Sequence, residues 1–294
     1  MTIIKKKIKS LYKHIIYSAF KLIYGKIDTS SKFYSHDDII IKKTNNKKIQ
    51  NPDKKNYLIY ELKNSRISND FVENVAVIHK NKILRKISYQ QVNGKFEDIN
   101  YNSAIYKGTP YFKKKINGNV LCLTQGASGH TNYFHWLYDI LPKIKIYSEK
   151  YKLNNLDYLY LSKLQKYQKK TLISLGLGNI KILDAKKHRH FSADKIFAVE
   201  HPWYNKGYSL KEVNKLPDWI VQWLRKSFLK NSKKFKCNKK IFIDRSDSSF
   251  NHCQLINNQE VYSFLKEQGF TKYKVGQLSW EKQIYLFKNA KIIV

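Results

Sequence analysis

The sequence predicts an α/β protein in which strands and helices alternate. Beyond Pro142, short apolar runs bounded by Gly, Asn or Lys alternate with amphipathic runs, a rhythm typical of a parallel, doubly wound sheet. The 294 residues, of which 42% are hydrophobic, suffice for one large domain or two smaller ones. No apolar run approaches the roughly 20 residues that span a membrane.

The first 27 residues have the pattern of a basic amphipathic helix, with lysines between apolar residues such as Ile8, Leu11 and Ile15. Such a helix either lies on an anionic membrane surface or packs on its own domain. Residues 30–55 are polar and typical of a linker. Strands are then expected over residues 56–62 and, as a hairpin that turns at 79–81, over 74–79 and 82–88.

A buried strand over residues 119–124 leads through Gly126, Ser128 and Gly129 into a helix for which Thr131 is the expected N-cap. The remaining elements follow from the alternation of apolar and amphipathic runs. Strands are expected over 158–161, 179–183, 195–199, 240–243, 272–275 and 291–294, and helices over 165–175, 217–228, 257–268 and 279–288.

The helix after Thr131 carries the residues best suited to chemistry. His135 and Asp139 stand four residues apart, so they share one helical face. An imidazole above a carboxylate, placed after a strand and a Gly-rich turn, is suited to proton transfer at a ligand site. The alternative is a core helix that carries an ordinary ion pair. The glycines lack the G-x-G-x-x-G spacing of dinucleotide-binding proteins.

The formal net charge of +34 raises the question of nucleic-acid binding. We do not expect it, because the basic residues are nearly all lysines, whereas base readout favours arginine. Attraction to anionic lipids or nucleotides fits the charge equally well.

Cysteine and histidine spacing argues against a built-in metal. Cys122, Cys237 and Cys253 are widely separated, which predicts neither a disulfide framework nor a zinc site and fits a reducing cytoplasm. The histidines outside the focal helix show no metal-ligand spacing; they include His188, His190 and His201. No structural metal is therefore predicted.

Four blocks of the sequence, in matching order, resemble glycosyltransferase family 61. Residues 132–144 are similar to its N-x-x-H-W-x-x-D-x-L-P-R-L signature, and residues 241–246 to its strand followed by Ser-Arg. Residues 255–270 resemble a Leu-x-Asn-Glu segment that ends in Gly-Phe, and residues 278–290 resemble L-S-x-x-E-Q-x-x-L-F-x-x-A.

The resemblance implies two Rossmann-like domains in a GT-B-like arrangement, the second incomplete at its C-terminus. It implies an inverting glycosyltransferase that moves a sugar from a nucleotide-sugar donor, expected to be a UDP-sugar, to a glycan acceptor in capsule or cell-surface polysaccharide synthesis. We expect a basic amphipathic helix over residues 1–28, an acceptor-side α/β domain with N-terminal β-hairpins over 29–235, and the start of a truncated, Rossmann-like donor-binding domain over 236–294. Dependence on a divalent metal is open. The protein is expected in the cytoplasm, either free or bound peripherally to the inner membrane.

On the acceptor side, a base must take the proton of the acceptor hydroxyl. We expect this base to be His135 or Asp139, with Asp139 equally suited to orient His135. Asn132 either binds a sugar or fixes the loop before the helix.

On the donor side, Arg245 and Ser246 follow an apolar strand, where a diphosphate would bind, unless Arg245 forms a salt bridge with Asp244 or Asp247. Ser248 and Ser249 could add hydroxyl donors there. Asn257 and Glu260 either contact the nucleotide or cap a helix, and Gln283 completes the expected substrate-binding set.

The sequence also departs from the family pattern. Cys253 and Gln254 stand at the positions of an Arg-Arg pair, and Lys282 stands at the Glu of the Glu-Gln pair. The family's H-G-A-G-x-x-N loop, expected directly after Val294, is not in the sequence. Two alternatives therefore stay open: a truncated, non-catalytic scaffold that binds glycan or nucleotide, and a basic module that binds membranes or nucleic acid.

Overall fold

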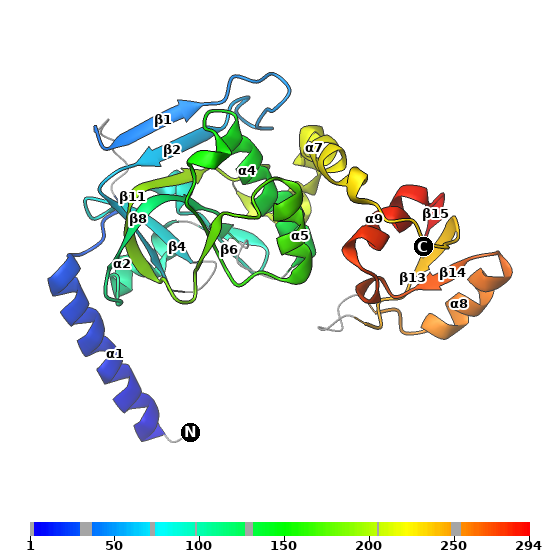
Figure 1. Cartoon of the computed structure of the whole chain (residues 1–294). Helices are drawn as coiled ribbons and strands as arrows, with labels where there is room; N and C mark the ends of the chain where they lie inside the picture. Colours follow the sequence, from blue (N-terminus) through cyan, green and yellow to red (C-terminus); the bar gives the residue numbers. More distant parts are fainter. Residues whose placement is uncertain are drawn as a thin grey trace. The chain divides into compact units, whose positions relative to one another are not determined.

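The computed structural model describes residues 3–294 except 30–36, 71–73, 98, 127–131, 205 and 248–253 (Figure 1). The chain divides into two compact units. Unit 1 comprises Met1–Lys169 with Leu177–Val221, and unit 2 comprises Lys170–Gly176 with Gln222–Val294. Two helices, α5 (Lys166–Ser174) and α7 (Asp218–Phe228), contribute residues to both units.

Unit 1 is built on a mixed sheet that has nine strands among the described residues. Four neighbouring strands are parallel and lie in the order β10-β9-β8-β11. Their bounds are Lys114–Cys122 for β8, Tyr158–Leu161 for β9, Lys181–Asp184 for β10 and His190–Val199 for β11. This half of the sheet agrees with the expected alternation of strands and helices.

The other half of the sheet is antiparallel. Strand β11 pairs through its first residues with β3 (Ser65–Asn69) and through its last with β2 (Leu58–Leu62). Beyond them lie β1 (Ile39–Lys43), β4 (Val75–His79) and β5 (Lys82–Ile83). The α/β class is thus confirmed, but the parallel arrangement expected beyond Pro142 does not extend to the pairing of β11 with β2 and β3, and two Rossmann-like domains are not confirmed.

The predicted hairpin at residues 79–81 is present. Lys80 and Asn81 both have positive φ, 44° and 60°, as a two-residue hairpin turn between β4 and β5 requires. Its second strand ends early, because Arg85–Ile87 forms the 3-10 turn η1. A second hairpin, β6 (Gln90–Val92) and β7 (Lys95–Glu97), turns at Asn93-Gly94 and pairs with β12 (Gly207–Tyr208).

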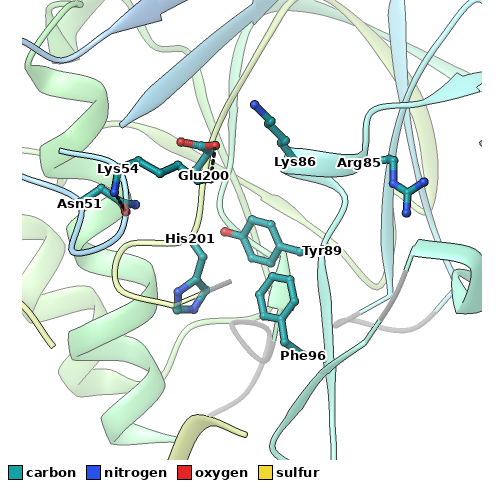
Figure 2. Close-up of a pocket in the computed structure, with 8 residues that line it drawn as sticks. All are labelled: Asn51, Lys54, Arg85, Lys86, Tyr89, Phe96, Glu200 and His201. Atoms are coloured by element: carbon teal, nitrogen blue, oxygen red, sulfur yellow. Dashed lines mark hydrogen bonds and ion pairs between the residues drawn. The ribbon is translucent and has the colours of Figure 1, made fainter. Parts of the chain in front are cut away.

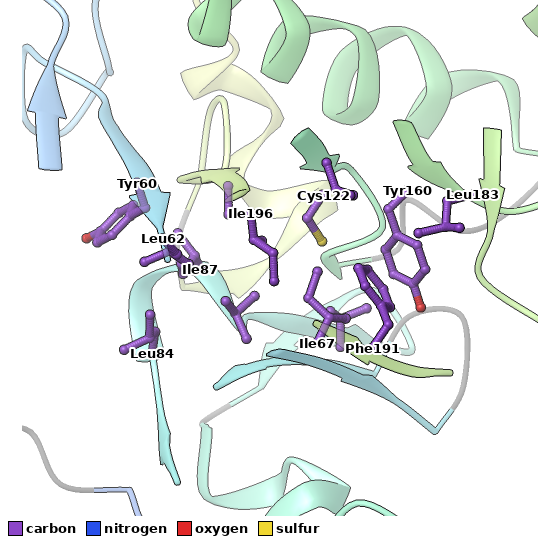
Figure 3. Packing of buried hydrophobic residues seen from close by; sticks show 14 of the residues in the cluster. Tyr60, Leu62, Ile67, Leu84, Ile87, Cys122, Tyr160, Leu183, Phe191 and Ile196 are labelled. Atoms are coloured by element: carbon purple, nitrogen blue, oxygen red, sulfur yellow. The ribbon is translucent and has the colours of Figure 1, made fainter. Parts of the chain in front are cut away.

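The core of unit 1 lies against the sheet and mixes both of its halves (Figure 3). Ile67 and Leu62 come from the antiparallel strands, whereas Tyr160, Phe191 and Ile196 come from the parallel ones, and all five are at most 1% exposed. Burial of these side chains fixes the register of the sheet. A one-residue slip of a strand would turn its buried apolar side chains to the opposite face of the sheet.

The helix expected over the first 27 residues is present as α1 (Ile3–Tyr24). Its last turns pack on the rest of unit 1: the rings of Phe20 and Phe112 lie 5.2 Å apart, and those of Tyr24 and His190 lie 4.7 Å apart. The short helix α2 (Ser103–Lys107) lies near α1, and α6 (Ser209–Glu212) follows β12. No helix among the described residues is long and apolar enough to cross a membrane.

Unit 2 contains a three-stranded parallel sheet in the order β14-β13-β15. The strands are β13 (Lys240–Ile243), β14 (Thr271–Tyr273) and β15 (Ile292–Ile293), and helices α8 (Asn258–Glu267) and α9 (Trp280–Asn289) connect them. Ser279 caps α9, as predicted, because its side chain accepts a hydrogen bond from the backbone N–H of Lys282. The sequence rhythm therefore predicted this unit well.

Candidate active site

The candidate site lies at the topological switch point of the parallel strands, where consecutive strands are added to opposite sides of β8. From β8 the chain continues to β9 and then β10 on one side, whereas β11 pairs with the other side of β8. At such a switch point the loops after two adjacent strands diverge and leave room for a ligand. Here those loops are the segments after Cys122 and after Val199.

The segment after β8 enters one continuous helical stretch, α3 (Tyr133–His135), η4 (Trp136–Ile140) and α4 (Leu141–Ser148). Its N-cap is Asn132, whose Oδ1 accepts hydrogen bonds from the N–H groups of Phe134 and His135 at 2.9 and 3.3 Å. The cap was expected at Thr131, which lies outside the described residues together with Ser128, Gly129 and His130. Asn132 thus orients the helix that carries His135.

The middle of this stretch is π-helical. The N–H of Leu141 bonds to the carbonyl of Trp136, five residues back, and the next residue, Pro142, has no N–H to donate. Single π-helical turns inside α-helices occur frequently at functional sites. Here the turn contains Asp139.

His135 and Asp139 form the predicted pair. Nδ1 of His135 and Oδ2 of Asp139 are 2.6 Å apart, and because a carboxylate can only accept, His135 donates from Nδ1. Asp139 is fully buried, whereas the His135 side chain keeps about a fifth of its surface exposed. None of the described residues hydrogen-bonds Nε2 of His135, which therefore keeps its lone pair.

The second oxygen of Asp139 is held from the segment after β11. Nε1 of Trp203 donates to Oδ1 at 2.7 Å, and Nε2 of His201 lies 3.6 Å from the same atom. Nδ1 of His201 accepts the backbone N–H groups of Trp203 and Tyr204 at 3.3 and 3.2 Å, so His201 carries its proton on Nε2, facing Asp139. Three N–H groups therefore point at one buried carboxylate.

These donors keep Asp139 ionised. Burial alone would raise the pKa of its carboxyl, but the interactions with His201 and His135 outweigh burial and hold that pKa well below its usual range. Burial lowers the pKa of His201, so this imidazole is neutral at pH 7. The sequence reasoning missed His201 and Trp203 as site residues, although both follow a strand expected at 195–199.

Lys143 is a third residue that the sequence reasoning missed. Its ammonium is fully buried and donates to the carbonyls of Leu123 and Gln125 at 3.2 and 2.9 Å. Burial lowers the pKa of Lys143 to about 7. Lys143 thereby fastens the segment after β8 to the helix that carries Asp139.

In unit 2, the residues after β13 include Arg245 and Ser246. Arg245 is exposed and, among the described residues, forms no ion pair with Asp244 or Asp247. Asp244 instead accepts from the N–H of Ser246 and from Asn258, and Asp247 accepts from the N–H of Gly276. The salt bridge of Arg245, which was the alternative to anion binding, is therefore not observed among the described residues. Ser248, Ser249 and Cys253 lie outside the described residues.

The remaining donor-side residues have internal partners. Asn257 lies at the N-cap of α8 without a side-chain cap bond and donates to Glu260 at 3.3 Å. Gln283 donates to the carbonyls of Val275 and Leu278 at 3.0 and 3.1 Å, so its amide N–H groups stabilise the turn before α9. Their assignment to substrate stays a prediction.

Among the described residues, no group of three or more His, Cys, Asp or Glu side chains is arranged to hold a metal ion. In the network around Asp139, a buried carboxylate orients the ring of His135, whose Nε2 has no partner among the described residues, a geometry suited to acid–base chemistry.

The site combines an oriented imidazole with the carboxyl ends of parallel strands, an arrangement suited to an enzyme that activates a hydroxyl group. The family model described as Glycosyltransferase 61 matches residues 133–294, more than half of the chain. The protein therefore belongs to glycosyltransferase family 61, which implies a sugar donor and an acceptor. A comparison with curated proteins finds no match.

Proposed function

We propose that this chain is an inverting glycosyltransferase that moves a sugar from a nucleotide-sugar donor, expected to be a UDP-sugar, to a glycan acceptor in capsule or cell-surface polysaccharide synthesis. Family membership supports the reaction class. The observation that carries the proposal is the hydrogen bond between His135 and the buried Asp139, because it fixes the ring with a free Nε2.

In this mechanism His135 is the base and Asp139 the positioning residue. Nε2 of His135 takes the proton of the acceptor hydroxyl as its oxygen forms a bond to the anomeric carbon. The bond from that carbon to the diphosphate oxygen breaks on the opposite face, and the electron pair leaves with the nucleoside diphosphate. Asp139 stabilises the imidazolium that forms, as the carboxylate does in a Ser-His-Asp triad.

Arg245 and Ser246 are proposed to bind the departing diphosphate. Arg245 is exposed and not committed to either neighbouring aspartate, and it follows the central strand of a parallel sheet. Its guanidinium can pair with two phosphate oxygens at once. The altered family positions Gln254 and Lys282 make donor binding the first property to measure.

The test is replacement of His135 by Ala, with release of UDP from UDP-sugars as the readout. We expect turnover to fall by about 10²–10⁴-fold, the usual contribution of a general base. His188→Ala is the matched control, because His188 lies just before the start of β11, at the opposite end from the candidate site. Unchanged turnover in His135→Ala, with unfolding temperature also unchanged, would remove His135 from the mechanism.

We also propose that α1 holds the enzyme at an anionic membrane surface. Phe20 and Tyr24 face the rest of unit 1, whereas Ile8, Leu11 and Ile15 lie on another side of the helix and are 63, 64 and 58% exposed. Exposed lysines flank this apolar stripe. An exposed apolar stripe between cations suits a surface of anionic lipid.

Vesicle binding tests this second proposal without disturbing the packed end of α1. Wild-type protein should sediment with vesicles that contain phosphatidylglycerol and much less with neutral phosphatidylcholine vesicles. Leu11→Ser with Ile15→Ser changes only exposed side chains and should abolish sedimentation. Equal sedimentation of the double variant would rule out the stripe as the membrane contact.

A further inference from the structure

Beside the Asp139 network lies a pocket of about 260 Å³, entirely within unit 1 (Figure 2). It lies between η1, the β6–β7 hairpin and the segment after β11, with Tyr89, Phe96 and His201 among its lining residues. His201 joins the two sites: its ring lies 5.5 Å from that of Tyr89 and its Nε2 lies 3.6 Å from Asp139. A ligand in the pocket is therefore one side chain away from the carboxylate of Asp139.

The phenol of Tyr89 is the first feature that points to a ligand. The side chain is 4% exposed, and its hydroxyl has no hydrogen-bond partner among the described residues. Figure 2 shows this hydroxyl directed into the space between Glu200 and His201. An unpaired buried hydroxyl costs about 1–3 kcal/mol, so a ligand that bonds to it recovers that energy. Burial raises the pKa of Tyr89, which keeps the hydroxyl a donor.

Charge is the second feature. Lys54 lies 3.2 Å from Oε1 of Glu200, and Oε2 of Glu200 accepts the N–H of Leu58, so the one buried carboxylate of the pocket is already neutralised. Lys86 is exposed at the rim and forms no ion pair with any described residue. The pocket thus has an uncompensated cation and no uncompensated anion, and so selects an anionic group.

The volume sets the size of the ligand. Drug-sized molecules occupy pockets of about 300–1,000 Å³. A pocket of about 260 Å³ fits one saccharide unit but not a whole nucleotide sugar. The aromatic side chains offer an apolar wall to the C–H groups of such a ring.

We propose that this pocket is an acceptor subsite that binds a sugar unit carrying a carboxylate or phosphate, with Lys86 contacting the anion and Tyr89 donating to the sugar. The inference rests on the proposed function and narrows its acceptor to an acidic glycan. His135 is not among the lining residues, so the bound unit is a neighbour of the sugar that reacts and serves to position it.

The test measures binding of small sugars to the full chain by NMR titration, without donor. Methyl glucuronide and glucose 6-phosphate represent the two anions, and methyl glucoside is the neutral counterpart. We expect at least one charged sugar to bind about fivefold more tightly than the glucoside, the effect of one partly exposed ion pair. The charged sugar that shows the preference identifies the anion. Equal affinity for all three, or no binding of either charged sugar, overturns the proposal.

Variants separate the two contacts. Lys86→Met should remove the preference for the charged sugar, whereas Lys187→Met, at an exposed lysine elsewhere in unit 1, should keep it. Tyr89→Phe should weaken sugar binding about fivefold while leaving the unfolding temperature unchanged or higher, because the lost hydroxyl has no internal partner. A preference that survives Lys86→Met, or a Tyr89→Phe variant that binds as wild type, contradicts the assignment.

A competition with UDP distinguishes failure of this inference from failure of the proposed function. Saturating UDP should leave binding of the preferred charged sugar intact. If UDP displaces the sugar competitively, the pocket belongs to the donor and the acceptor subsite is refuted, although transfer itself is not. Loss of transfer in His135→Ala tests the function separately.

Discussion

Replacement of Asp139 by Asn tests the central hydrogen-bond network most directly. The wild-type carboxylate accepts from His135 and Trp203 at 2.6 and 2.7 Å and faces the Nε2–H of His201. An amide retains one acceptor oxygen and places an NH2 group opposite the other donors. His135 or Trp203 then faces a donor, and the imidazole is free to turn or change tautomer, which removes the lone pair from Nε2.

The expected size of the effect follows from this geometry. In a Ser-His-Asp triad the same substitution lowers turnover about 10⁴-fold, mainly through the wrong tautomer. Because the Asn132 cap still holds the backbone of His135, we expect a loss of about 10³-fold, or about 4 kcal/mol of transition-state stabilisation. Stability should fall by about 2 kcal/mol, since bonds to a charged acceptor are replaced by weaker ones.

Steady-state release of UDP and chemical denaturation provide the two measurements, and Trp203→Phe is the matched comparison. That variant removes one donor to Oδ1 but leaves the bond between His135 and Oδ2, so turnover should fall only about tenfold. Turnover of Asp139→Asn within threefold of wild type would show that Asp139 does not set the tautomer of His135.

Two further predictions concern buried groups near the site. In the folded protein Lys143 has a pKa near 7, below its value in the unfolded chain. Above pH 7 the unfolded chain therefore binds more protons than the folded protein. The free energy of unfolding should rise by about 2 kcal/mol from pH 7 to 9. Urea titrations should show this rise in the wild type and not in Lys143→Met; a flat wild-type profile would contradict the buried ammonium. Burial raises the pKa of the Cys122 thiol to about 11, so iodoacetamide at pH 8 should leave Cys122 unmodified while labelling Cys237, and peptide mapping that finds Cys122 alkylated in the native protein would disprove this protection.

Local signals in the sequence predicted a large part of the structure. The spacing of His135 and Asp139 predicted their contact because four residues bring side chains together on a helix even where one turn is π-helical. Strands β9 and β13 and the Ser279 cap were also predicted from short apolar runs and single capping residues.

Features that depend on distant partners were not predicted. Trp203 lies 64 positions beyond Asp139, so no local period could connect them. The strand expected at 195–199 does end next to His201, and the rule that ligands bind beyond the carboxyl ends of parallel strands would have indicated it. The antiparallel pairing of β2 and β3 with β11 was missed for the same reason, since strand direction is set by the partner and not by the apolar run itself.

Strand β11 has a consequence for how the protein is made. It pairs with β2, β3 and β8, so the sheet stays open until residue 199 has left the ribosome. Until then one edge each of β2, β3 and β8 is unpaired, a state prone to aggregation, and pairing between residues so far apart in the chain slows folding. Trp203 and His201 are synthesised just after β11, so the contacts that hold Asp139, and through it His135, form only after β11 has been made.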